Sequence, residues 1–249
     1  MEKADKRFLE KVRYKLVKAV EDYDLIQPHD KILVAVSGGK DSMVLLDALH
    51  NRKKYFNFPY EIIAVNIELT DVGYTIEKDK IEAFCNERNI PFFHIKNHTR
   101  IVDGKKHPCF YCAWNRRKLL FEWAVENGFN KVAFGHNRDD VVETLLMNMT
   151  YHAETSAFPV RLRMFDGKIE IIRPLIYVSN AEAKRYIALM NYTPVPYNCP
   201  FAEGNDREKF RALLRELYNI HPHAVENIFK SIQHIKTDYL PVLKSIPPR

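Results

Sequence analysis

Residues 31–37, KILVAVS, form a continuous apolar run that ends directly at a Gly-Gly pair. A run of this kind is typical of a strand that is buried on both faces, as the central strands of a parallel sheet are. The apolar spacing then changes to a helical period from Ser42 to about His50. Because neighbouring parallel strands need a crossover connection, usually a helix, this unit predicts an α/β fold.

The same alternation continues along the chain. Further strands are predicted at 60–68, 90–96, 130–136 and 168–176, and further helices at 78–89, 115–128, 138–152 and 179–191, the last with Ser179 as its N-cap. We therefore expect a doubly wound, mostly parallel sheet in which ligands bind at the carboxyl ends of the strands.

Helical segments flank this alternating region. Apolar residues recur at helical spacing in Phe8, Val12, Leu16 and Val20, which predicts an N-terminal amphipathic helix. The expected organisation is an N-terminal helix in residues 1–27, one α/β domain in residues 28–200 and a C-terminal helical extension in residues 201–249. With 249 residues, 46% of them hydrophobic, the chain has ample material for one core.

Composition narrows the class of protein. The N-terminal segment is too charged for a signal peptide, and no apolar run approaches the ~18–20 residues of a membrane span, so we expect a cytoplasmic protein with no membrane partner. Four cysteines in a reducing compartment indicate metal binding or redox chemistry rather than disulfides. The net charge of +6 permits nucleic-acid binding without establishing it.

The turn after the first strand has the form of a phosphate-binding loop. It reads Ser37-Gly38-Gly39-Lys40-Asp41-Ser42, and the following helix directs its N-terminal N–H groups at the turn. It is not a Walker A motif, because no glycine stands five residues before Gly39 and Asp41 separates the lysine from the serine.

With this loop the chain resembles the PP-loop ATP-pyrophosphatases, which cleave ATP between the α- and β-phosphates and adenylate their substrates. The resemblance extends over residues 31–211. It includes GHNRDD at 135–140, PCFYCAWNRRK at 108–118, IIRPL at 171–175 and Cys199 in NCP. These elements are similar to those of the iron–sulfur-dependent tRNA 2-thiocytidine synthetase family, which thiolates cytidine 32.

The resemblance implies a role for each matched residue. The nucleotide would be lined by the following positions: Ala35, Ser37, Gly38, Gly39, Lys40, Asp41, Ser42, Ile67 and Gly135. Arg116 would contact phosphate, and Asp140 would hold Mg²⁺ or orient the phosphates, since carboxylate oxygen suits that ion. Lys118 would stabilise charge that develops at the α-phosphate.

Three cysteines have competing interpretations. Cys109 and Cys112 are predicted to sit just before a helix, where thiolates are stabilised. With Cys199 they could hold a 4Fe–4S cluster, bind zinc, or carry persulfide as a redox pair. Zinc normally takes four protein ligands, and a fourth would have to be His107, very near Cys109. Three thiolates suit a 4Fe–4S cluster with one iron open for sulfide. Cys85 is instead expected to be a buried small hydrophobe.

The expected activity is ATP-dependent tRNA sulfur transfer to cytidine. tRNA would be bound by one of two basic surfaces, the face of Lys11, Lys15 and Lys18 or the stripe of Arg207, Arg211 and Arg215, either of which could also be an ordinary solvated face. Sulfide, a cysteine desulfurase or a carrier protein would donate sulfur, and a homodimer is also considered. Two rivals remain: thiolation or desulfuration of another nucleoside or nucleobase, and a non-catalytic adenine-nucleotide-binding module.

Overall fold

The structure, a computed structural model, describes residues 2–70, 77–98, 108–195 and 206–241. In chain order the elements are α1 (Lys3–Asp22), β1 (Lys31–Ala35), α2 (Lys40–Arg52), η1 (Lys53–Tyr55), β2 (Glu61–Leu69), α3 (Lys78–Asn86), β3 (Phe92–Asn97), α4 (Pro108–Glu126), β4 (Lys131–Ala133), α5 (Arg138–His152), β5 (Arg161–Met164), β6 (Ile169–Ile172), α6 (Asn180–Leu189), α7 (Asp206–Ile220), α8 (Ala224–Ser231) and η3 (Thr237–Tyr239). The expected alternation of strands and helices is confirmed.

The strands form one six-stranded sheet in the order β3-β2-β1-β4-β6-β5. Every neighbouring pair is parallel except β5 and β6. On β1, Ile32 lies opposite Ile62 of β2 on one side and Lys131 of β4 on the other. The chain moves outward in opposite directions from this central pair, so the carboxyl ends of β1 and β4 border the crevice where α/β sheets bind ligands.

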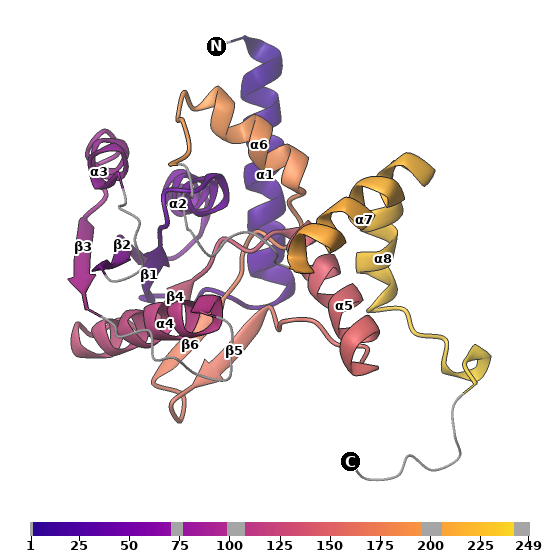
Figure 1. Ribbon diagram of the computed structural model, residues 1–249. Coiled ribbons are helices and arrows are strands. Elements are labelled where there is room, and N and C mark those ends of the chain that lie inside the picture. The colour runs from indigo at the N-terminus through magenta and orange to yellow at the C-terminus, as the bar shows by residue number, and fades with distance from the viewer. Residues whose placement is uncertain (1, 71–76, 99–107, 196–205, 242–249) are drawn as a thin grey trace.

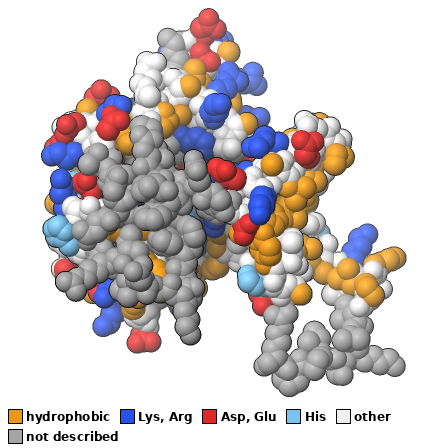
Figure 2. Space-filling view, in the orientation of Figure 1, with side chains coloured by type: hydrophobic (Ala, Val, Ile, Leu, Met, Phe, Trp, Pro, Cys, Tyr) orange, Lys and Arg blue, Asp and Glu red, His pale blue; other side chains and the backbone are white. Residues whose placement is uncertain are grey.

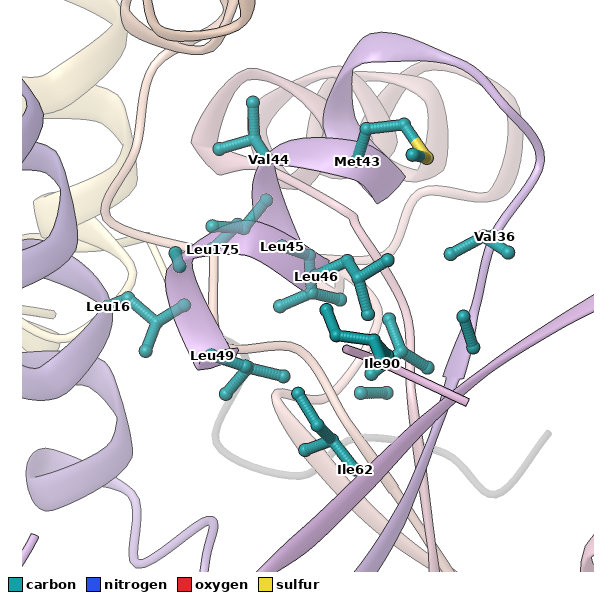
Figure 3. Close-up of a cluster of buried hydrophobic side chains, with 14 of the residues drawn as sticks. Leu16, Val36, Met43, Val44, Leu45, Leu46, Leu49, Ile62, Ile90 and Leu175 are labelled. Atoms are coloured by element: carbon teal, nitrogen blue, oxygen red, sulfur yellow. The ribbon is translucent and has the colours of Figure 1, made fainter. Parts of the chain in front are cut away.

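Helices cover both faces of the sheet (Figure 1). On one face, α1, α2 and α6 share a core cluster that includes Leu16, Leu46 and Tyr186. Figure 3 shows side chains of α2 in this cluster close to Val36 and Ile62 of the sheet region. On the other face, α4 packs Leu120 and its neighbours against the sheet. A third cluster joins α5, α7 and α8 to Ala19 of α1. No helix in the described ranges is long and apolar enough to cross a membrane.

Two local predictions were wrong. Strand β5 was not predicted; it is a short antiparallel edge strand with two arginines among its four residues and no fully buried residue, which leaves it little apolar signal. The helix expected from residue 115 begins at Pro108, so Cys109 and Cys112 lie inside α4 rather than before it. Proline is favoured at the first helical position, because its missing N–H is not needed there.

Candidate active site

A cavity of about 430 Å³ opens at the carboxyl ends of β1, β2 and β4. This volume is within the usual range for small-molecule and cofactor sites. Its lining comes from three strand ends, three helices and one later segment: Ala35, Val36, Ser37, Gly39, Asp41, Ser42, Val65, Asn66, Ile67, Ala113, Arg116, Arg117, Leu120, Phe134, Gly135, His136, Asp140 and Val195.

The Ser37–Ser42 turn forms one wall of the cavity. Gly38 has φ +78°, a left-handed conformation that glycine adopts without steric cost. Ser42 Oγ donates to the Gly39 carbonyl at 2.9 Å and accepts from Ser37 N–H at 3.2 Å, which holds the turn closed. Gly39 is the N-cap of α2 and supplies no capping side chain. The first N–H groups of α2 are therefore suited to bind an anion.

Gly135 brings β4 into contact with this turn. A Cβ atom at Gly135 would lie 2.8 Å from both the Asp41 carbonyl carbon and the Ser42 nitrogen. Real Cβ atoms essentially never come this near to backbone atoms. The residue after Phe134 must therefore lack a side chain for the strand end and the phosphate turn to meet.

Two carboxylates from different elements line the cavity, Asp41 at the start of α2 and Asp140 in the first turn of α5. Asn137 joins them: its Nδ2 donates to Asp41 at 3.0 Å, and its backbone N–H donates to Asp140 at 2.8 Å. Burial raises the pKa of Asp140 to about 6, and the carboxylates of Asp41 and Glu143 add to the effect. Such a pair suits Mg²⁺ together with phosphate oxygens.

His136 lies in the same cavity beside a buried arginine. Arg173 Nε donates to His136 Nδ1 at 3.3 Å, and the Arg173 guanidinium lies 4.9 Å from the centre of the Phe158 ring. Burial lowers the pKa of His136 to about 3, assisted by the positive charges of Arg173, Arg117 and Arg207. The imidazole is therefore uncharged at neutral pH.

Helix α4 contributes Arg116 and Arg117 to the cavity but not Lys118. Lys118 is about half exposed, 3.7 Å from Glu122 and 5.6 Å from the centre of the Trp114 ring. Cys112 is buried beside the cavity-lining Ala113, in the core cluster under α4. The side chain of Cys109 and all of His107 and Cys199 lie outside the described residues. Among the described residues, no three Cys, His, Asp or Glu side chains group as a metal site.

Most predicted nucleotide-site residues converge here: Ala35, Ser37, Gly39, Asp41, Ser42, Ile67, Arg116, Gly135 and Asp140 line the cavity, and Gly38 shapes its turn. Lys40 is not part of the lining and pairs with Asp41 at 2.5 Å. Cys85 is fully buried, which confirms the prediction made for it, and burial raises its pKa to about 12.

Sequence reasoning missed four polar or distant residues that line the cavity, Asn66, Arg117, His136 and Val195, and also Asn137, which bonds both carboxylates. His136 and Asn137 stand within the GHNRDD stretch. Asn137 could have been found as the N-cap of α5, because it forms a capping box with Asp140. Val195 could not have been found by local pattern, since its N–H bonds the Gly38 carbonyl, at 3.0 Å, across more than 150 residues.

The two predicted basic surfaces differ in their surroundings. On α1, Lys15 pairs with Glu182 at 2.7 Å and Lys18 with Asp22 at 2.9 Å. On α7, Arg207 and Arg211 both donate to the buried Glu143 of α5, at 3.1 and 3.2 Å. Figure 2 shows Lys and Arg side chains in several separate groups on this face rather than in one continuous patch.

Comparisons with known proteins agree with this site. The family described as "PP-loop domain" matches residues 8–197, so the chain belongs to that family. A tRNA-cytidine(32) 2-sulfurtransferase of Herminiimonas arsenicoxydans is 35% identical over 89% of this chain and 71% of its own length. One of Polynucleobacter asymbioticus is 36% identical over 93% and 78%. The chain therefore belongs to the tRNA-cytidine(32) 2-sulfurtransferase family.

A solved structure shows the same fold. The U34-tRNA thiolase NcsA from Methanococcus maripaludis, with its 4Fe–4S cluster, superposes with a TM-score of 0.74 at 23% sequence identity. The match covers 92% of this chain and 79% of that one. At this identity the likeness establishes the α/β architecture, which agrees with the doubly wound sheet expected from the sequence.

Proposed function

We propose that this protein is an ATP-dependent tRNA sulfurtransferase that acts on cytidine 32. The observation that carries the proposal is the convergence on one cavity of the Ser37–Ser42 turn, two carboxylates and the arginines of α4. The names of the relatives supply the substrate, tRNA, and the modified position.

The chemistry follows from the poor leaving group at a pyrimidine C2 carbonyl. The C2 oxygen attacks the α-phosphorus of ATP and pyrophosphate leaves. A sulfur nucleophile then attacks C2, and AMP departs with the original oxygen. The α2 N-terminus and Arg116 would hold the phosphates, and Asp41 and Asp140 would hold Mg²⁺. For Lys118 to stabilise charge at the α-phosphate, its side chain would have to leave Glu122 and turn toward the cavity.

Cys109, Cys112 and Cys199 would hold a 4Fe–4S cluster. Two features support this set: Cys109 and Cys112 are three residues apart on α4 and so share one helix face, and Val195, four residues before Cys199, lines the cavity. When bound, the cluster supplies an iron with an open position for sulfur.

The direct test is a reaction with unmodified tRNA, ATP, Mg²⁺ and sulfide under anaerobic conditions, using protein reconstituted with iron and sulfide. We expect 2-thiocytidine in the digested tRNA and AMP with pyrophosphate as nucleotide products. ADP as the sole nucleotide product would contradict adenylation. Sulfur in another nucleoside would favour the rival substrate, and ATP binding without any product would favour a non-catalytic nucleotide-binding module.

The cysteine assignment has its own prediction. Changing Cys109, Cys112 or Cys199 to Ala should abolish both the visible absorption of the cluster and the thiolation. Cys85→Ala is the matched control, because its thiol is fully buried in the core formed by α1, α2 and α6, and this variant should keep the colour and the activity. Loss of colour in Cys85→Ala alone would overturn the ligand set.

Several finer points belong to the same proposal. Residues 28–200 would form the catalytic unit, between the helix of residues 1–27 and the extension of residues 201–249, in a cytoplasmic enzyme. Sulfide, a cysteine desulfurase or a carrier protein would donate sulfur. Light scattering of the reconstituted protein measures its mass in solution and so tests for a homodimer. The mass of a single chain would exclude the homodimer.

A further inference from the structure

His136 and Arg173 form a buried polar pair at the carboxyl ends of β4 and β6. Arg173 is only 8% exposed. Its Nε donates to His136 Nδ1, and its Nη1 donates to the Pro159 carbonyl. The rings of His136 and Phe158 are 4.8 Å apart, so Phe158 packs against both members of the pair. Within the described ranges Arg173 forms no ion pair with a carboxylate.

This contact determines where the imidazole proton resides. A guanidinium can only donate hydrogen bonds, so Nδ1 of His136 must accept and must be unprotonated. The proton of a neutral ring is then on Nε2. The charged groups that act on the ring, Arg173, Arg117 and Arg207, are all positive, and they add to burial in disfavouring imidazolium. Arg173 occupies the Nδ1 edge and is not among the cavity-lining residues, so Nε2 is the ring nitrogen that remains for a ligand.

The position of His136 in the cavity indicates which kind of ligand atom its Nε2–H would bind. His136 follows Gly135, where an added Cβ would lie 2.8 Å from the backbone of Asp41 and Ser42 at the start of α2. His136 therefore lies beside the phosphate-binding turn. Its Nε2–H is a donor that Arg173 polarises from behind, and both features favour an anionic oxygen over a neutral base edge.

We propose that His136 is an uncharged Nε2–H donor to a phosphoryl oxygen of the bound nucleotide, held in this tautomer by Arg173. The proposal rests on the function proposed above, because it requires ATP in this cavity. In the adenylation step His136 donates a hydrogen bond and transfers no proton. Arg173 is a positioning residue, which supplies positive charge without entering the cavity lining.

The first test observes the tautomer directly. In protein labelled with ¹⁵N-histidine, a ¹H–¹⁵N correlation at pH 7 should show His136 with a protonated Nε2 and an unprotonated Nδ1, unchanged down to pH 5. Loss of the signal in His136→Gln assigns it. In Arg173→Met the ring should titrate at higher pH and mix its tautomers. A wild-type ring that is imidazolium at pH 7, or that carries its proton on Nδ1, would overturn the proposal.

The second test measures binding of α,β-methylene ATP and of adenosine by calorimetry. His136→Ala should weaken binding of the ATP analogue about 10- to 100-fold, the range for a lost hydrogen bond to a charged group, and should leave adenosine binding within about twofold. His136→Gln, which keeps an N–H near the Nε2 position, should recover most of that loss. Equal losses for Ala and Gln, or an equal loss of adenosine binding, would overturn the donor role.

These readouts separate the inference from the proposed function. Absence of tRNA thiolation, with the expected tautomer and binding, would contradict the sulfurtransferase proposal and support the donor. Normal thiolation with an imidazolium at His136 would contradict the donor alone.

Discussion

The contact between β4 and the phosphate turn requires a glycine at position 135, because any side chain there would clash with the turn. In Gly135→Ala the new methyl group would meet backbone atoms of Asp41 and Ser42, which cannot rotate away as a side chain could. The start of α2 must then move from the strand end. We expect a loss of about 1–3 kcal/mol in unfolding free energy, typical of overpacking, and at least tenfold weaker binding of α,β-methylene ATP. Urea denaturation and calorimetry measure the two effects.

Gly128→Ala is the matched control for that substitution. Gly128 has φ +72° with open space around its Cβ position, so an alanine there is strained without meeting any neighbour. We expect a comparable loss of stability, about 1–3 kcal/mol, and unchanged nucleotide affinity. Equal losses of nucleotide affinity in the two variants would show that Gly135 acts only through general stability.

His136 also predicts how stability changes with acidity. Its pKa is about 3 in the folded protein and near the ordinary 6.5 in the unfolded chain. Between these values the unfolded chain binds a proton that the folded protein does not, so acid lowers stability, by at most about 1.4 kcal/mol per pH unit from this group. Urea midpoints at pH 7, 6 and 5 should fall less in His136→Gln than in the wild type. Identical slopes would contradict the neutral ring.

At the scale of helices, Asp47 of α2 links α1, the segment after α3, and α6 through one buried carboxylate. Its fully buried carboxylate on α2 accepts from Arg13 of α1 at 3.0 Å, Arg88 after α3 at 2.9 Å and the Tyr186 hydroxyl of α6 at 2.5 Å. In Asp47→Ala two largely buried guanidinium groups would lose their buried counter-charge, and each would keep only a more exposed carboxylate, Glu10 for Arg13 and Glu87 for Arg88. We expect the unfolding free energy to fall by about 3–5 kcal/mol, as when one partner of a buried ion pair is removed.

The control for Asp47 is Asp206→Ala, which breaks an exposed pair with Lys209. Exposed pairs contribute little, so the urea midpoint should hardly move. A small effect of Asp47→Ala would show that water replaces the lost carboxylate and that the four segments are held by apolar packing alone.

The elements that were predictable are those whose own residues carry the apolar pattern. β1, β2 and α2 are buried along most of their length, so their sequences carry a clear pattern of apolar residues. β5 was missed because four residues at a sheet edge carry almost no pattern, although Asp166-Gly167 between it and β6 is a hairpin signal. Ser179 was correct as the N-cap of α6, because capping is a local interaction.

The same limit applied to the site: residues next to a predicted strand were found, and contacts between distant segments were not. Residues contiguous with a strand end, such as Ser37 and Gly135, could be assigned from their stretch alone. The contact of Arg173 with His136 and that of Val195 with Gly38 depend on chain segments that meet only after folding. Local spacing also does not determine which side of α4 turns toward the cavity, and the structure places Lys118 outside its lining.

At the scale of the whole molecule, the chain has a net charge of +6, and two basic surfaces, the lysines of α1 and the arginines of α7, are candidates for tRNA binding. α7 packs on α5, and the first turn of α5 carries the cavity residue Asp140. On each surface two of the three predicted side chains are paired with carboxylates, so pairing does not distinguish α1 from α7, whereas the positive charge of Arg207 on α7 acts on the cavity residue His136. We therefore expect the arginines of α7 to contribute more to tRNA binding than the lysines of α1.

This difference can be measured by neutralising two charges on each surface. Arg211→Gln with Arg215→Gln keeps the Arg207–Glu143 pair, so the buried glutamate retains a partner. Because each lost phosphate contact removes about one unit from the slope of log affinity against log salt, this variant should bind tRNA more weakly at low salt, with a slope flatter by up to about two. Lys11→Gln with Lys18→Gln should change the slope less, and both variants should bind ATP normally. Equal effects from the two surfaces, or a salt slope that neither pair alters, would exclude α7 as the principal tRNA-binding element.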